Sequence, residues 1–168
     1  MKKILIIFVI LILVILVNEK EYKISEDSIR FRVIANSNTP QDIIMKERVV
    51  SELSGLLFVD NKNINNTREK IYSNLENIED RIKKLFDKYN YNKTFNVIYG
   101  VNSFPEKVFL GEKYPAGDYE SLVIEIGESK GNNYFCILYP SLCMIDYEKH
   151  KDEKQFGFKI SELLEQLF

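Results

Sequence analysis

The sequence predicts an α+β domain in which helices cover one face of a mostly antiparallel sheet, preceded by an N-terminal hydrophobic helix. Three observations support this prediction. An apolar run occupies residues 4–17, apolar residues at helical spacing occupy two stretches between residues 40 and 89, and alternating apolar residues follow. The expected order is therefore a strand, two helices, three strands and a final helix.

Two lysines followed by an uninterrupted apolar run give the N-terminus the pattern of an export signal. As a helix, residues 4–17 would measure about 21 Å at roughly 1.5 Å per residue, which is short for a hydrocarbon core of about 30 Å. The flank at residues 18–22 offers no small side chains suited to cleavage. Residues 1–17 are therefore either a signal peptide or an uncleaved signal anchor. Lysines on the cytoplasmic side would leave the rest of the chain outside.

The remainder of the chain has the length of one ordinary domain. We expect a linker at residues 18–28 and a single extracytoplasmic α+β domain at residues 29–168. The chain carries 23 Lys and Arg against 25 Asp and Glu, a net charge of −2. Because this balance provides no excess of basic side chains for phosphates, we expect no nucleic-acid partner.

The first strand is predicted at residues 29–34, where apolar and basic side chains alternate. Ile29, Phe31 and Val33 would face the core. Arg30 and Arg32 would lie on the opposite face, either as its solvated side, which we favour, or as a basic stripe for an acidic partner. Turn-forming residues then end the strand.

Two amphipathic helices should follow. Thr39 is a good N-cap for the first, with Pro40 in the first turn and Asp42 as the acidic partner of a capping box. Thr67 is the plausible N-cap of the second. The first apolar face comprises Met45, Val49, Val50, Leu53, Leu56 and Leu57. The second, with the most regular spacing in the sequence, comprises Ile71, Leu75, Ile78, Ile82, Leu85, Phe86 and Tyr89.

Strand-like alternation begins at Phe95, and residues 122–126 and 134–138 form two further predicted strands. The polar stretch between these two strands predicts an antiparallel hairpin. Residues 101–118 contain two prolines and two glycines, so we expect an irregular loop there. The amphipathic residues 159–168 predict a final helix.

The predicted loop is rich in large apolar groups for a surface segment. These groups are Phe104, Pro105, Phe109, Tyr114, Pro115 and Tyr119. Long loops of this kind often bind a partner. The alternative is that the side chains fold back over an open face or edge of the sheet. The residues alone favour neither.

The sequence contains no recognisable catalytic or metal-binding motif. Its single histidine, His150, lies in a charged run, and the carboxylates lack metal-ligand spacing. We therefore expect no metal, no cofactor and no small-molecule substrate. Cys136 and Cys143 are either a disulfide, which requires the chain to reverse between them, or two buried thiols. A nucleophilic Cys143 acting with His150 is the weaker alternative.

Four motifs occur in order at residues 29–38 (IRFRVIANSN), 103–107 (SFPEK), 114–120 (YPAGDYE) and 134–143 (YFCILYPSLC). Together they resemble the stage II sporulation protein R family of endospore-forming bacteria, over a span from about Ile29 to Asp146. The departures are conservative. Tyr134 and Phe135 stand where tryptophans are expected, and the segment Pro140-Ser141 replaces a pair of prolines.

The resemblance implies an exported signalling protein, made in the forespore and secreted, or tethered to the membrane through residues 1–17, in the space between the two membranes of the sporangium. In that family the signal leads a membrane-embedded aspartic protease of the mother cell to cleave the precursor of sigma factor E. The chain would then be the trigger and not the protease. The segments 104–119 and 134–143 would form the face that contacts the protease.

Family positions carried over as candidate partner-binding residues are Arg30, Arg32, Asn36, Ser37, Asn38, Phe104, Pro105, Pro115, Gly117, Tyr119 and Glu120, with Cys136 and Cys143 as a possible disulfide. Two alternatives stay open from the residues alone. The runner-up is a small exported hydrolase that uses Cys143 or a carboxylate pair beside the long loop. The third is a tethered structural protein that bridges two membrane surfaces.

Overall fold

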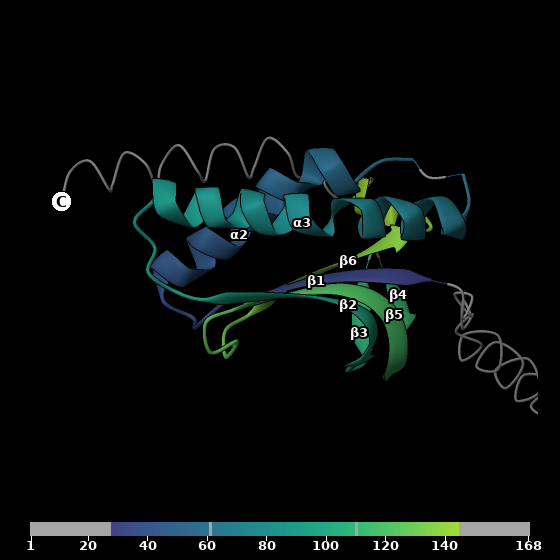
Figure 1. Cartoon of the computed structure of the whole chain (residues 1–168). Helices are drawn as coiled ribbons and strands as arrows, with labels where there is room; N and C mark the ends of the chain where they lie inside the picture. The colour runs from purple at the N-terminus through teal and green to yellow at the C-terminus, as the bar shows by residue number, and fades with distance from the viewer. Residues whose placement is uncertain (1–27, 61, 110, 145–168) are drawn as a thin grey trace, which may run out of the picture.

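The computed structural model describes residues 28–60, 62–109 and 111–144. Figure 1 shows the two helices on one face of a sheet and a short hairpin on the opposite face. The predicted hydrophobic segment at residues 1–17, the final helix at 159–168 and His150 lie outside the described residues. In chain order the elements are β1 (Ile29–Ile34), α2 (Pro40–Leu57), α3 (Ile64–Lys88), β2 (Phe95–Phe104), β3 (Lys107–Phe109), β4 (Glu112–Tyr114), β5 (Gly117–Ile126) and β6 (Asn133–Tyr139).

The main sheet has four strands in the order β2-β5-β1-β6. β1 runs parallel to β5 and antiparallel to β6, and β2 runs antiparallel to β5. Two helices on one face of this sheet confirm the predicted α+β class. The sheet is mixed, however, so the prediction of a mostly antiparallel sheet misses the parallel pairing at its centre.

The predicted hairpin between residues 122–126 and 134–138 is wrong, because β1 lies between β5 and β6. Arg30 of β1 pairs with Ser121 of β5 on one side and with Ile137 of β6 on the other. The physical reason is that β1 is covered on both faces, and such a strand buries most surface at the centre of a sheet. The β5–β6 connection therefore spans two strand spacings, about 10 Å.

The predicted irregular loop at residues 101–118 is also wrong, because most of it is strand. β2 and β5 form one hairpin ladder along the full length of both strands, and β3 and β4 form a second, short hairpin at its end. Pro105 and Pro115 fall between the ladders, where neither removes an inter-strand hydrogen bond. Gly111, in the β3–β4 connection, has a φ of 83°, which glycine adopts without strain.

The two helices begin at side-chain caps. The Thr39 hydroxyl accepts the backbone N–H of Asp42 at 3.4 Å, and Pro40 opens α2, as predicted. The Thr39 N–H donates to the Ser37 hydroxyl at 3.2 Å, so Asp42 does not complete the predicted capping box. The prediction of Thr67 as the second N-cap is wrong. Asn63 is the cap, and its side-chain oxygen accepts the backbone N–H of the third residue after it at 3.0 Å. α3 therefore starts earlier, and Thr67 lies buried in its first turn.

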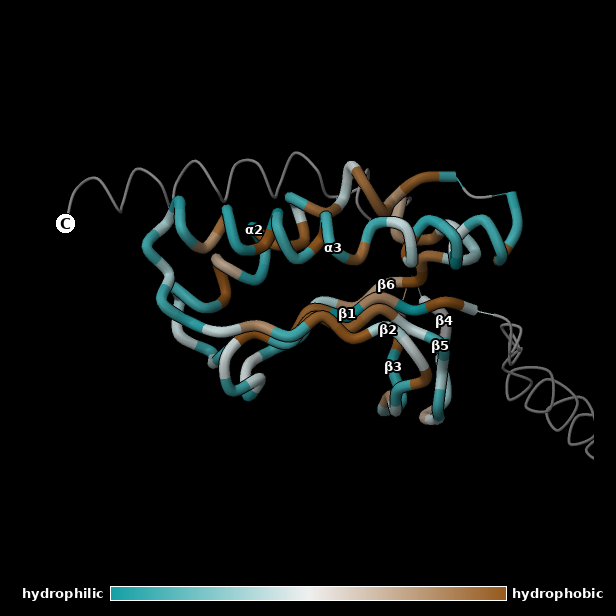
Figure 2. The backbone as a smooth tube through the Cα atoms, in the orientation of Figure 1, coloured by the Kyte–Doolittle hydropathy of each residue, from teal (hydrophilic) through white to brown (hydrophobic). Residues whose placement is uncertain are grey.

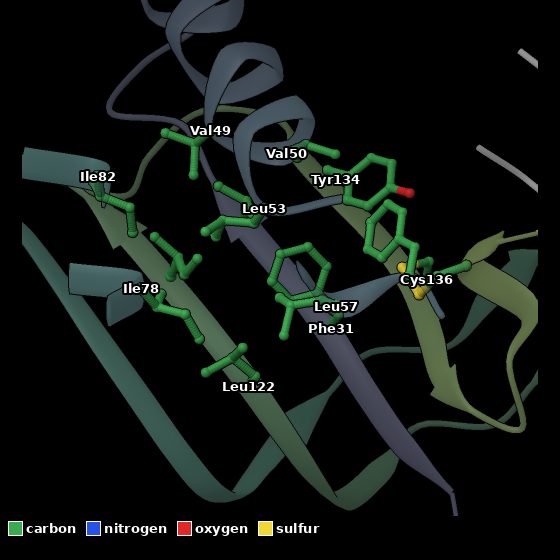
Figure 3. Close-up of a cluster of buried hydrophobic side chains, with 14 of the residues drawn as sticks. Phe31, Val49, Val50, Leu53, Leu57, Ile78, Ile82, Leu122, Tyr134 and Cys136 are labelled. Carbon is green, nitrogen blue, oxygen red and sulfur yellow. A yellow bond between two sulfur atoms is a disulfide. The ribbon is translucent and has the colours of Figure 1, made fainter. Parts of the chain in front are cut away.

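The hydrophobic core lies between the helices and the sheet. In Figure 3, Phe31 and Leu122 of the sheet lie in one buried cluster with side chains of both helices. Figure 2 shows the same division along the chain, with apolar stretches in the strands beneath helices whose outer turns are polar. The predicted apolar faces are confirmed by the buried residues Met45, Val49, Val50, Leu53, Leu57, Ile71, Ile78, Ile82 and Phe86.

Candidate functional site

The face of the sheet opposite the helices carries a group of basic and aromatic side chains. We call it the arginine–aromatic cluster, and its members are Arg30, Arg32, Phe104, Tyr114, Tyr119 and Phe135. β1 contributes both arginines, because side chains alternate across a strand and its apolar residues face the helices. The rings come from β2, β4, β5 and β6. Residues far apart in the chain thus meet on one face.

Arg30 lies at the centre of this cluster. Its guanidinium carbon is 3.2 Å from the centroid of the Tyr119 ring and 5.3 Å from that of Phe104. The side chain is 2% exposed. The interpretation of Arg30 as part of a solvated face is therefore wrong. The β3–β4 hairpin covers that face, and the alternation within β1 carries no information about a hairpin so distant in the sequence.

The Arg30 guanidinium is stabilised more by aromatic rings than by hydrogen-bond acceptors. Burial lowers the pKa of the Arg30 guanidinium, and Tyr119 partly offsets this effect. Arginine still remains charged at neutral pH. Within the part of the chain that the structure describes, its Nε and Nη1 atoms donate to no acceptor. Stacking on aromatic faces suits a weakly hydrated guanidinium, so the cluster is a cation–π cage.

Arg32 lies at the margin of the same cage and is half-buried. Its guanidinium carbon is 4.4 Å from the centroid of the Phe104 ring, which therefore contacts both arginines. Burial lowers the pKa of Arg32, and the nearby Glu125 carboxylate offsets part of that shift. The exposed basic stripe considered from the sequence is thus reduced to the outer part of Arg32.

The β3–β4 hairpin packs against the sheet through edge-on aromatic contacts. The Phe135 ring of β6 lies 5.5 Å from the Phe109 ring and 6.2 Å from the Tyr114 ring, measured between centroids. Phe104 lies 6.0 Å from the same Phe135 ring. The aromatic side chains of the predicted loop therefore fold back over the sheet, and segments 104–119 and 134–143 lie against each other.

The outward side of the hairpin is exposed. We define the hairpin surface as the exposed residues Pro105, Glu106, Val108, Lys113 and Pro115. Val108 is the most apolar of them and is 68% exposed. At the base of the hairpin, a Cβ at Gly117 would lie 3.2 Å from the Tyr119 ring. Gly117 therefore provides the space in which Tyr119 can cover Arg30.

The residues Asn36, Ser37 and Asn38 follow the other end of β1 and connect two loops. The Asn36 side-chain oxygen accepts the Glu128 N–H at 3.0 Å, and that of Asn38 accepts the Asn132 N–H at 2.7 Å. A Cβ at residue 131 would lie only 2.2 Å from the Ser37 carbonyl oxygen. These contacts tie the β1–α2 turn to the β5–β6 loop, which is a structural role.

A buried carboxylate beneath this turn was not recognised from the sequence as a site. Asp42 accepts hydrogen bonds from Ser37 at 2.5 Å, from the Tyr91 hydroxyl at 2.5 Å and from Asn36 at 2.8 Å. Burial alone would raise the pKa of Asp42, but these hydrogen bonds lower it to about 2. Burial and the Asp42 hydrogen bond raise the pKa of Tyr91. Tyr91 follows α3, too distant in sequence for a local pattern to reveal the pair.

Glu120 belongs to the opposite face of β5 and contacts α3. The Arg68 Nη2 atom donates to its carboxylate at 2.7 Å, and the Tyr99 hydroxyl donates at 2.5 Å. The hydrogen bond from Arg68, partly offset by burial, lowers the pKa of Glu120. Glu120 therefore links α3 to the sheet and is separated by the sheet from the arginine–aromatic cluster.

Cys136 and Cys143 form a disulfide, with their Cα atoms 5.1 Å apart. Figure 3 shows the bond beside Cys136, at the edge of the hydrophobic core. The chain reverses after Tyr139, the place that the sequence required. Because the Cys143 sulfur is bonded, it is not a free nucleophile here, and the Cys143 version of the hydrolase alternative loses its premise.

Neither a metal site nor a membrane span occurs within residues 28–60, 62–109 and 111–144. No three or more His, Cys, Asp or Glu side chains gather there to hold a metal ion, and no helix there is long and apolar enough to cross a bilayer.

The candidate residues thus divide among three places. Asn36, Ser37 and Asn38 lie apart from the others at the β1–α2 turn, and Glu120 lies under α3. The remaining candidates meet at the arginine–aromatic cluster and its hairpin, and these are Arg30, Arg32, Phe104, Pro105, Pro115, Gly117 and Tyr119. Sequence reasoning missed Phe135 as a member of the cluster. The signal was available, because Phe135 alternates with the inward Cys136 and must face away from the helices.

Comparisons with known proteins agree with the motifs. Residues 25–149 match the family described as Stage II sporulation protein R. The chain is 31% identical over 147 residues to the Stage II sporulation protein R of Bacillus subtilis (strain 168), an alignment that covers 83% of this chain and 66% of that protein. The chain thus spans about two thirds of the length of this curated relative. No solved structure matches.

Proposed function

Because the chain belongs to the stage II sporulation protein R family, we propose that it is an exported sporulation signal that triggers processing of the sigma factor E precursor. The match over residues 25–149 is the observation that carries this proposal. The partner is a membrane-embedded aspartic protease of the mother cell. The chain acts between the two membranes of the sporangium, secreted or held by residues 1–17, and activates the protease without cutting the precursor itself.

The disulfide supports the proposed location. Disulfides persist in oxidising compartments outside the cytoplasm and are rare within it. The Cys136–Cys143 bond closes the segment that follows β6 onto the strand. An exported chain would form and retain this bond, whereas a chain kept in the cytoplasm would be exposed to reducing thiols.

The hairpin surface is the proposed contact with the protease. It is exposed, it carries an apolar side chain at Val108, and the cation–π cage beneath it fixes its position. A surface held in one conformation loses little entropy on binding. By binding the active state of the protease more tightly than the inactive one, the hairpin surface would shift the population toward activity.

Reconstitution tests the function. The protease and the precursor are expressed in a non-sporulating bacterium, with or without the full chain, and precursor processing is followed by immunoblot. Processing should appear only when the chain is present, and it should disappear when residues 1–17 are deleted, because the chain then stays on the wrong side of the membrane. An exported, folded chain that leaves the precursor intact would refute the proposal.

A pair of charge variants tests the contact. Val108→Asp places a carboxylate on the hairpin surface, whereas Asn92→Asp places one at an exposed turn between α3 and β2. Burying an unpaired charge at an interface costs more than about 1.4 kcal/mol, so Val108→Asp should lower the chain's apparent affinity at least tenfold. With the Asn92→Asp variant, the protease should process the precursor as it does with the unaltered chain. Equal activity of the two variants would remove the hairpin surface from the mechanism but leave the function intact.

A further inference from the structure

β2 is an edge strand of unusual length and composition. It spans Phe95–Phe104, and among the described elements it pairs only with β5. Proteins commonly protect such edges with charged residues, prolines, bulges or short length. The ten residues of β2, FNVIYGVNSF, include neither a charged residue nor a proline, and its register with β5 continues without a shift. Within residues 28–60, 62–109 and 111–144, this edge is therefore open to pairing.

The backbone geometry identifies which groups are available. The Gly127 N–H donates to the Thr94 carbonyl at 2.8 Å, immediately before β2 begins. Antiparallel pairs alternate between bonded and non-bonded positions, so the even-numbered residues of β2 bond to β5. The odd-numbered residues, from Phe95 to Ser103, direct their N–H and C=O groups away from β5. These five alternate positions span residues 95 to 103, which is longer than a typical strand of about 5–6 residues, so a whole strand can pair there.

The side chains along this edge are also apolar and accessible. Val101 is 73% exposed, and Ile98 on the opposite face is 38% exposed. On the helix side, Tyr72 of α3 packs edge-on against Tyr99, with ring centroids 4.9 Å apart, and is itself largely exposed. A strand laid along β2 would bury parts of all of these side chains.

A groove of about 580 Å³ lies beside the start of β2, between that strand and the flank of α3. Its lining residues are Ser73, Glu76, Asn77, Glu79, Asp80, Lys83 and Phe95. Three carboxylates against one ammonium give the groove a negative charge. Asp80 is partly neutralised by Lys84 at 2.6 Å, whereas Glu76 and Glu79 are exposed carboxylates that face solvent.

We propose that β2 accepts an extended segment of a partner protein as a fifth strand, with basic side chains on the side that faces α3. Main-chain hydrogen bonds to the odd-numbered residues provide the pairing, as in other cases of strand addition. Alternate residues of the added strand point to opposite faces, so basic residues meet Glu76 and Glu79 while apolar residues contact Ile98. The partner segment is therefore an alternating basic and apolar strand.

Charge argues against a second copy of this chain as the occupant. Two β2 strands that paired antiparallel about a twofold axis would bring the two α3 flanks to the same side of a continuous sheet. Each groove, at the Phe95 end of one β2, would then lie beside the Ser103 end of the other β2, and β2 contains no basic side chain that could pair with the groove carboxylates. A basic segment provides such side chains. The β2 edge is a different surface from the hairpin surface, so a failure of strand addition would leave the proposed function unaffected.

A labelled peptide of four Lys-Val repeats, acetylated and amidated, is the probe. Its binding to the full chain in a mild nonionic detergent is followed by fluorescence anisotropy. An analogue with every backbone nitrogen methylated keeps the side chains but loses the donors of the main-chain hydrogen bonds to β2. It should bind at least tenfold more weakly. A Glu-Val peptide of the same length should not bind measurably.

Variants of the chain test both parts of the inference. Val101→Pro removes an outward N–H, whereas Val101→Thr keeps it and serves as the control. Only the proline variant should bind the peptide less tightly. Glu76→Lys with Glu79→Lys should weaken binding on the order of tenfold, because two exposed attractions become repulsions. Equal binding of the methylated peptide, unchanged binding by the lysine variant, or a chain dimer lost in Val101→Pro would each overturn the inference.

Discussion

Replacing Asp42 by Asn should destabilise the fold at neutral pH and have little effect in strong acid. The Asp42 carboxylate accepts three side-chain hydrogen bonds, from Ser37, Asn36 and Tyr91, and lies buried under the β1–α2 turn. An amide of the same shape accepts at one oxygen only, and its NH₂ group faces donors. The substitution thus leaves buried donors unsatisfied.

The magnitude follows from the pKa of Asp42, which is lowered from 3.8 to about 2. Each pKa unit corresponds to about 1.4 kcal/mol, so the native state favours the ionised carboxylate by about 2 kcal/mol. The folded pKa lies below the unfolded one. The contribution is therefore complete above about pH 4 and is lost as the pH falls through about 2.

Urea unfolding of the full chain in detergent, followed by far-UV circular dichroism at pH 7, 4, 3 and 2, measures this dependence. The stability difference between wild type and Asp42→Asn should be about 2 kcal/mol at pH 7 and should shrink toward pH 2. Asp80→Asn, at an exposed ion pair with Lys84, is the control and should cost under about 0.5 kcal/mol at pH 7. A difference that stays constant down to pH 2 would refute the reasoning.

Three further predictions concern the cage, the disulfide and two glycines. Arg30→Lys keeps the charge but loses planar stacking on Tyr119, and should cost about 1–2 kcal/mol in urea unfolding; no measurable loss would contradict the cage. Replacing Cys136 and Cys143 together by Ala should lower the free energy of unfolding by about 2 kcal/mol. A reducing agent should then no longer change the urea midpoint. A change that persisted would show that the reducing agent does not act through this disulfide. Gly131→Ala should lower the free energy of unfolding by more than about 1 kcal/mol, because its Cβ would lie 2.2 Å from the Ser37 carbonyl oxygen. Gly55→Ala should raise the free energy of unfolding by about 0.5–1 kcal/mol, because Gly55 is helical and no atom lies within 4 Å of the added Cβ. The same sign for both glycine variants would contradict the local geometry.

Local patterns predicted local structure. Thr39 and Pro40 marked the start of α2, because the capping hydroxyl and the fixed φ of proline act within one turn. The apolar spacing of α3 identified its buried face for the same reason. The misplaced cap at Thr67 shows the limit of this reasoning, since Asn63 is an equally good cap and begins the helix one turn earlier.

The pairing of strands far apart in the chain could not be predicted from the sequence. The alternation in β1 placed Ile29, Phe31 and Val33 in the core, but it could not reveal that β1 would separate β5 from β6. Nor could it show that Arg30 would be buried, because the rings that cover it come from strands about 75 or more residues later. The Asp42–Tyr91 hydrogen bond joins residues 49 positions apart and was missed for the same reason.

The prolines misled the prediction of residues 101–118. Pro105 and Pro115 do interrupt strands, yet each lies in a short gap, so β2, β3, β4 and β5 fit around them. The aromatic residues of this segment were correctly identified as unusual. Their contacts with Phe135 depend on a hairpin that the punctuated sequence did not indicate.

The proposal that this chain triggers a protease and does not itself cut the precursor is tested by an immunoblot of the sigma factor E precursor in three strains of a non-sporulating host. One strain carries the chain with the protease, one carries the chain with a protease whose catalytic aspartate is replaced, and one carries the chain alone. Processing is expected in the first strain only. Processing in the strain that carries the chain alone would contradict the proposal.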